Sequence, residues 1–190
     1  PASYDLRSLA AHTLTEIEPA YACAFVDNHD TQPGQALESW VQPWFKPLAY
    51  AYILLRDSPY PCVFFGDWYG MPHEGTAPTP FLHELVWTRA HLLGDVIVPQ
   101  QGDDARTLCW KVDGPHPLYV VLNTADDQVV RNVRDEHLAS RTFVDMCHPD
   151  ATVVVADDGR ASLPCPQRAC AVYMDADDYA VLQEAMRRRV

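Results

Sequence analysis

The chain has few basic residues, few glycines and no long apolar run. Its 190 residues include 14 Lys plus Arg against 26 Asp plus Glu, a formal net charge of -12. This excess of negative charge repels a phosphate backbone, so we expect no nucleic-acid partner. No apolar run approaches the roughly 20 residues that a membrane-spanning helix needs, so we expect no membrane partner either. With 48% hydrophobic residues and only 8 glycines, the composition is typical of a folded globular protein.

Several motifs that would identify a site are also missing from the sequence. There is no Gly-rich phosphate loop and no G-x-S-x-G elbow, and no C-x2-C pair is present. His83 and His91 are eight positions apart, too far to share a metal ion on one helix, so we interpret both as structural. The six cysteines are predicted to be buried free thiols, which favours a reducing compartment; a bridge between Cys165 and Cys170 would need a bend in the chain.

The first half of the chain alternates helical and strand patterns. Helical spacing predicts helices over 4–17, over the second half of 37–57 and over 80–93, with Thr79 as the N-cap of the last one. Between them, the apolar segments 22–26 and 61–65 are predicted to be strands buried on both faces. This order is typical of an α/β architecture with a parallel sheet.

The second half changes to short alternating segments that are separated by turn residues. This spacing predicts an antiparallel β-sandwich, and the segments are "TLCWKV", "LYVVLN", "QVVRNV", "RTFVDM", "ATVVVA" and "ACAVYM". The tail is helical again, with Asp175 or Asp177 as its cap. We therefore expect an α/β part over 1–96, a sandwich over 97–176 and a helical tail over 177–190.

Polar clusters follow both predicted parallel strands. Asn28, His29 and Asp30 come after the first strand, and Asp67 and Tyr69 lie in the "GDWYG" segment after the second. The carboxyl edge of a parallel sheet is where α/β folds place ligands. Turn formation is the alternative for both clusters, because Asn and Asp bond to their own backbone and Gly-Asp is common in turns. For Asp67 and Tyr69 we favour the turn interpretation.

Two long segments carry a specific resemblance to a known family. They are "FVDNHDTQPGQALESW" and "PWFKPLAYAYILLRDSPYPCVFFGDWYG", in this order. The chain resembles the C-terminal portion of an α-amylase of glycoside hydrolase family 13, in particular the bacterial liquefying type and its fungal intracellular relatives. The resemblance is close over about residues 3–94 and weak in the part that follows. It implies the last part of a TIM (β/α)8 barrel, followed by an antiparallel β-sandwich known as domain C.

The resemblance also implies roles for two residues. Asp30 corresponds to the family's third catalytic carboxylate, which stabilises the oxocarbenium-like transition state, and His29 to the histidine that binds the same sugar. A fixed carboxylate is suited to this role, since positive charge develops on the sugar ring. Without the resemblance, turn formation would be the favoured interpretation of this pair.

Other parts of the family pattern have no counterpart in this sequence. The resemblance implies that the nucleophile Asp, the general-acid Glu and the main calcium ligands all lie before Pro1. Calcium is therefore expected for the full-length family member, with its main ligands outside this chain. In the domain C part only Asp103 and Asp104 are approximate candidates for a further calcium site.

The resemblance predicts retaining endo-hydrolysis of α-1,4-glucans such as starch or glycogen by a parent protein, this chain alone being inactive. Two alternatives stay open: a catalytically inactive carbohydrate-binding or interaction module, and a glucan transglycosylase of the same family. The expected partners are an α-glucan and the missing N-terminal part of the barrel. The cysteines and the intracellular relatives favour the cytoplasm, with secretion left open.

Overall fold

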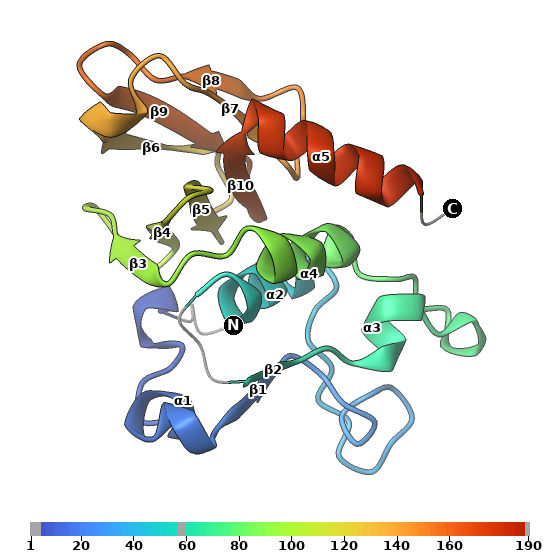
Figure 1. The fold of residues 1–190 in the computed structure, drawn as a ribbon. Coiled ribbons are helices and arrows are strands. Elements are labelled where there is room, and N and C mark those ends of the chain that lie inside the picture. The colour runs from blue at the N-terminus through green and yellow to red at the C-terminus, as the bar shows by residue number, and fades with distance from the viewer. Residues whose placement is uncertain (1–4, 57–59, 189–190) are drawn as a thin grey trace.

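The computed structural model describes residues 5–56 and 60–188. It shows two layers of structure (Figure 1): a small α/β part in blue and green, and a β-sandwich in yellow and red. Helices α2 and α4 lie between the strands of the α/β part and the sandwich in this view, and α5 runs beside the sandwich strands above α4. The predicted combination of an α/β part and an antiparallel sandwich is confirmed.

The α/β part is organised around a two-stranded parallel sheet. Strand β1 (Cys23–Phe25) pairs with β2 (Tyr60–Cys62), Cys23 lying opposite Tyr60. Its helices are α1 (Leu14–Ile17), α2 (Lys46–Leu54), α3 (Phe65–Tyr69) and α4 (Leu82–His91), with short 3-10 helices at Leu6–Ser8, Pro19–Tyr21 and Pro72–Glu74. Because both strands run in the same direction, the residues after β1 and after β2 lie at one edge of the sheet.

Three predictions for this part need correction. The single helix expected over 4–17 is interrupted, because His12 has a φ of +61° that a helix cannot contain; Tyr4 lies outside the described residues. Thr79 is not an N-cap, since α4 begins after Phe81, whose φ is +62°. Strands β1 and β2 are not buried on both faces: Phe25 is 52% exposed and Cys62 is also exposed, because the two strands pair only with each other among the described residues.

The sandwich consists of a six-stranded antiparallel sheet and a two-stranded ribbon. The sheet has the order β3-β4-β5-β10-β7-β8, and the ribbon pairs β6 with β9. The strands are β3 (Val96–Pro99), β4 (Thr107–Asp113), β5 (Leu118–Asn123), β6 (Val129–Arg134), β7 (Thr142–Asp145), β8 (Thr152–Val154), β9 (Arg160–Cys165) and β10 (Ala169–Asp175). A 3-10 helix at Glu136–Leu138 precedes β7. Strands β3 and β9 were not anticipated: both contain proline, which lowers strand propensity.

The two parts share one hydrophobic core. Leu48 and Leu55 of the α/β part belong to the same buried cluster as Trp110 and Val120 of the sandwich. The ring N–H of Trp110 donates to the carbonyl of Leu55 at 2.7 Å, so a buried polar group also joins the parts. The α/β strands are thereby held against a large, well-packed support.

The chain ends in α5 (Ala176–Arg187), which confirms the predicted helical tail. Asp175 is the N-cap, and its side chain accepts from the amide of Asp177, one of the two caps considered from sequence. Among the described residues, no helix combines the length and the apolar character needed to cross a membrane.

Candidate functional site

The chain turns sharply directly after β1. The side-chain oxygen of Asn28 accepts hydrogen bonds from the amides of Asp30 and Thr31, both at 3.0 Å. In return, the backbone amide of Asn28 donates to the hydroxyl of Thr31 at 3.1 Å. This Asx turn is the local chemistry that Asn favours, and it reverses the backbone within four residues. The residues between Asn28 and Thr31 therefore stand at the apex of a tight loop.

The turn presents His29 and Asp30 to solvent. Their side chains are 83% and 58% exposed, and Nε2 of His29 lies 3.4 Å from Oδ1 of Asp30. The structure thus brings together the two predicted site residues, one imidazole and one carboxylate, at the carboxyl edge of the parallel sheet. Chemically the pair can accept and donate hydrogen bonds to the hydroxyls of a ligand while placing a negative charge beside it.

A buried ionic network lies beneath this turn. The ammonium of Lys46 lies 3.0 Å from Oδ2 of Asp27 and is hydrogen-bonded to Oδ1 of Asp67. The hydroxyl of Tyr50 donates to the other oxygen of Asp67 at 2.6 Å. All four side chains are buried. Burial raises the pKa of the Asp27 carboxyl, with Lys46 opposing that shift.

Sequence reasoning missed the role of Asp67. We interpreted "GDWYG" as turn material, but Asp67 lies within α3 and is 1% exposed. The available signal was Lys46, a charged residue at the start of an otherwise apolar helix: a buried lysine needs a carboxylate partner. Which carboxylates it meets depends on the packing of α2 against β1 and α3. Tyr69, in contrast, is 62% exposed.

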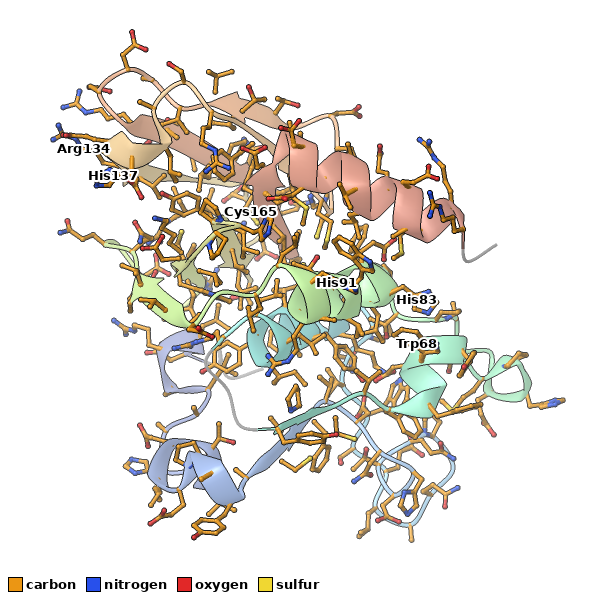
Figure 2. All side chains as sticks on the ribbon, in the orientation of Figure 1. Trp68, His83, His91, Arg134, His137 and Cys165 are labelled. Atoms are coloured by element: carbon orange, nitrogen blue, oxygen red, sulfur yellow. The ribbon has the colours of Figure 1, made fainter. Side chains whose placement is uncertain are left out.

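His83 and His91 are placed in structural surroundings, as predicted. In Figure 2, both labelled histidines lie on α4, and His83 is next to Trp68 of α3. The ring centroids of His83 and Trp68 are 3.9 Å apart. The ring of His91 stacks on that of Trp87, with 4.5 Å between the centroids. In the described part of the chain, neither histidine has a hydrogen bond or ring contact with the turn that carries His29.

The calcium candidates in the sandwich do not fit a calcium site. Oδ1 of Asp103 accepts from Arg131 and from the amide of Cys109, while Asp104 accepts from the amides of Arg106 and Thr107. Hard cations such as Ca²⁺ take six to eight oxygen ligands. Within residues 5–56 and 60–188, no three His, Cys, Asp or Glu side chains group to hold a metal ion. Asp103 and Asp104 instead serve as acceptors for Arg131 and for backbone amides.

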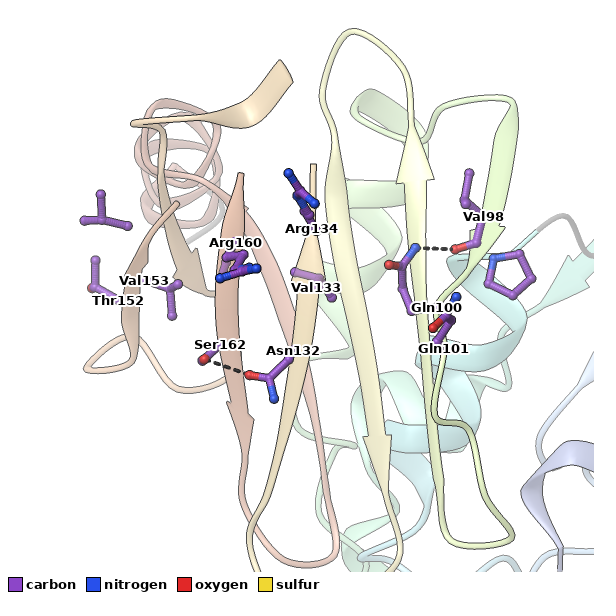
Figure 3. Close-up of a pocket in the computed structure, with 13 residues that line it drawn as sticks. Val98, Gln100, Gln101, Asn132, Val133, Arg134, Thr152, Val153, Arg160 and Ser162 are labelled. Atoms are coloured by element: carbon purple, nitrogen blue, oxygen red, sulfur yellow. Dashed lines mark hydrogen bonds between the residues drawn. The ribbon is translucent and has the colours of Figure 1, made fainter. Parts of the chain in front are cut away.

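A groove of about 910 Å³ lies on the sandwich, away from the turn. Figure 3 shows Asn132 and Arg134 of β6 beside Arg160 and Ser162 of β9, flanked by β8 and the end of β3. The hydroxyl of Ser162 donates to Asn132, and both arginines contact nearby acidic residues, Glu136 and Asp158. Several polar side chains of this groove thus already have protein partners, and no aromatic residue is among the described residues that line it.

Comparison with known proteins shows which proteins this chain resembles. A stretch of 70 residues is 63% identical to the α-amylase of Geobacillus stearothermophilus, covering 37% of this chain and 13% of that protein. The chain is similar to part of an α-amylase. Over 185 residues it is 31% identical to the cytoplasmic α-amylase of Escherichia coli K12, covering 90% of this chain and 37% of that α-amylase. No family model matches the chain.

A solved α-amylase has the same fold. The α-amylase I of Eisenia fetida, determined as a complex with maltohexaose, superimposes with a TM-score of 0.57 over 80% of this chain and 40% of that protein, at 17% identity. The predicted resemblance to α-amylases is therefore confirmed in sequence and in fold. The chain spans 13% to 37% of the length of the curated α-amylases described above.

Proposed function

We propose that this chain is the C-terminal portion of an α-amylase-type retaining endo-glycosidase that acts on α-1,4-glucans such as starch or glycogen. The observation that carries the proposal is the exposed His29–Asp30 pair at the carboxyl edge of a parallel sheet, in a chain similar to α-amylases. The relatives are much longer than this chain, which leaves room for the rest of a barrel. An α-glucan is then the partner of the site.

In this proposal Asp30 stabilises the transition state and His29 holds the same sugar. As the glycosidic bond breaks, the ring gains oxocarbenium character, and a fixed carboxylate at its hydroxyls favours that charge. The Asx turn at Asn28 supports this role, because a carboxylate stabilises charge only if it is held in place before the reaction. Retention of configuration needs a nucleophilic carboxylate and a carboxylic acid roughly 5 Å apart. We propose that both groups belong to the part of the longer protein before Pro1.

The first experiment compares the 190-residue chain with the longer protein encoded by its gene. The longer protein is expected to release reducing ends from soluble starch, and this chain alone is expected to release none. In the longer protein, Asp30→Asn should lower kcat about 100-fold or more, because the oxygen that remains carries no charge. Hydrolysis by the 190-residue chain that Asp30→Asn abolishes would contradict the assignment of the nucleophile and acid elsewhere.

The same assays separate the two alternatives. A carbohydrate-binding module would bind maltohexaose without turnover even in the longest encoded protein. A transglycosylase would convert maltohexaose into products longer than the substrate, which chromatography of the products detects. Only shortening of the glucan, dependent on Asp30, supports the hydrolase.

A further inference from the structure

Lys46 is the centre of the buried network beneath the turn. Its side chain is 4% exposed, and those of Asp27 and Asp67 are 1% exposed. The ring of Trp40 lies over the ammonium at 3.1 Å and closes one side of it. An ammonium that faces two carboxylates and an aromatic ring has exchanged all its water for protein groups.

The network has more carboxyl groups than amino groups. The carboxyl groups of Asp27 and Asp67 both face the single amino group of Lys46. Burial and the neighbouring Asp67 raise the pKa of Tyr50, so its hydroxyl stays protonated and donates to Asp67. Lys46 is the ion-pair partner of Oδ2 of Asp27, an atom that is buried without any hydrogen-bond donor among the described residues.

Asp27 connects this network to the turn. Its Oδ1 accepts from the hydroxyl of Thr31 and from the amide of Val41, both at 3.3 Å. The hydroxyl of Thr31 in turn accepts from the Asn28 amide. A continuous chain of polar contacts thus runs from the Lys46 ammonium through Asp27 and Thr31 to the backbone on both sides of Asp30.

We propose that Lys46 is a positioning residue for the His29–Asp30 pair. The inference rests on the proposed function, since it gives Lys46 a purpose in glucan hydrolysis. Apolar side chains would fill the same volume at similar or better stability, because buried charges lose their hydration. Such side chains would hold the strand end without orienting the Asp27 carboxylate. The ionic network fixes that orientation, and with it the hydroxyl of Thr31 and the turn.

The sandwich provides a matched control in Lys111. This lysine is also buried, and its ammonium lies 2.8 Å from Asp113 and 2.5 Å from Asp135. Lys111→Met therefore removes an ammonium between two carboxylates, as Lys46→Met does. Lys111 lies in the sandwich, where none of the described residues forms a hydrogen bond or ion pair with residues 28–31. A general loss of stability should affect both variants alike.

The first experiment uses the 190-residue chain and NMR hydrogen exchange. Lys46→Met should speed exchange of the Thr31 and Val41 amides by about tenfold or more relative to core amides of the sandwich. Lys111→Met should leave that ratio unchanged. If Lys46→Met does not fold, Thr31→Val breaks the same chain of contacts and keeps the ion pairs. This variant should speed hydrogen exchange at the backbone amides of residues 31 and 41. Unchanged exchange in the variant that folds, or an equal effect of Lys111→Met, would overturn the proposal.

The second experiment measures kcat and KM for soluble starch in the longer protein. Lys46→Met should lower kcat about 100-fold with a much smaller change in KM, because misplacing a transition-state group affects the chemical step. Lys111→Met should retain the wild-type kcat. Starch hydrolysis that needs Asp30 but not Lys46 would refute the positioning role alone. No hydrolysis by the wild type would refute the proposed function, while the exchange experiment would still decide whether Lys46 orders the turn.

Discussion

The ammonium of Lys46 lies 3.0 Å from Oδ2 of Asp27, although the two residues are separated by a turn, a long loop and the start of α2. This contact fixes the end of β1 to the first turn of a helix that packs against the sandwich. The exposed pair His29 and Asp30 therefore stands on a support that reaches the hydrophobic core.

The buried Asp27 carboxyl predicts a specific pH dependence of stability. Burial raises the pKa of this carboxyl in the folded state above the ordinary value of 3.8, which applies to the unfolded state. At a pH between the unfolded-state pKa and the folded-state pKa, the folded state therefore binds more protons than the unfolded state. Stability contributed by this group therefore rises as the pH falls through the raised pKa. In urea unfolding from pH 7 to pH 4, wild type should gain stability relative to Asp27→Asn, which cannot titrate. A constant difference across this range would show that the Asp27 pKa is not raised.

The hydrogen bond from Trp110 to Leu55 should contribute to the joint between the two parts. Trp110→Phe leaves the buried Leu55 carbonyl without this donor and removes part of a buried ring. We expect a loss of about 1–3 kcal/mol in the free energy of unfolding, measured by urea titration. As a control, Trp44→Phe changes a ring that is 40% exposed and should alter stability by less than about 0.5 kcal/mol. Equal losses in the two variants would argue against a role for the bond.

Gly94 should not tolerate a side chain. A Cβ at this position would lie 2.0 Å from the backbone oxygen of Asp113, which cannot move without disturbing β4. Gly94→Ala is therefore expected to lower the free energy of unfolding by roughly 1–3 kcal/mol. Gly75 has open space around it and a φ of +66°, which Asn tolerates, so Gly75→Asn should be close to neutral. Thermal unfolding of both variants tests the contrast.

The cysteines should differ sharply in reactivity. All six are free, as predicted, and four of them are buried. The predicted burial is wrong for Cys23 and Cys62, which are exposed because β1 and β2 pair only with each other among the described residues. Burial raises the pKa of Cys109 to about 12, so its reactive thiolate is scarce at pH 8. Native protein treated with iodoacetamide should therefore be labelled at Cys23 and Cys62, and unfolded protein at all six positions. Rapid labelling of Cys109 in the native state, seen by mass spectrometry, would contradict the burial of that thiol.

Much of the fold was accessible from the sequence because the local patterns are strong. Period-two alternation located most strands of the sandwich, and Asp175 was one of the two residues considered as the cap of the final helix. The errors arose where backbone conformation depends on distant packing. Phe81 adopts a positive φ at the start of α4, and the proline-containing strands β3 and β9 are held by their neighbours. No local propensity reports these effects.

The sequence by itself determined the resemblance to α-amylases and the positions of His29 and Asp30, because a strand that ends in a polar cluster is a local pattern. Only the tertiary structure decided what holds that cluster. Asp27 follows β1, Lys46 begins α2 and Asp67 lies in α3, and the three meet when α2 packs against β1 and α3. Buried ion pairs depend on distances and on exclusion of water, and both are set by packing across the whole chain.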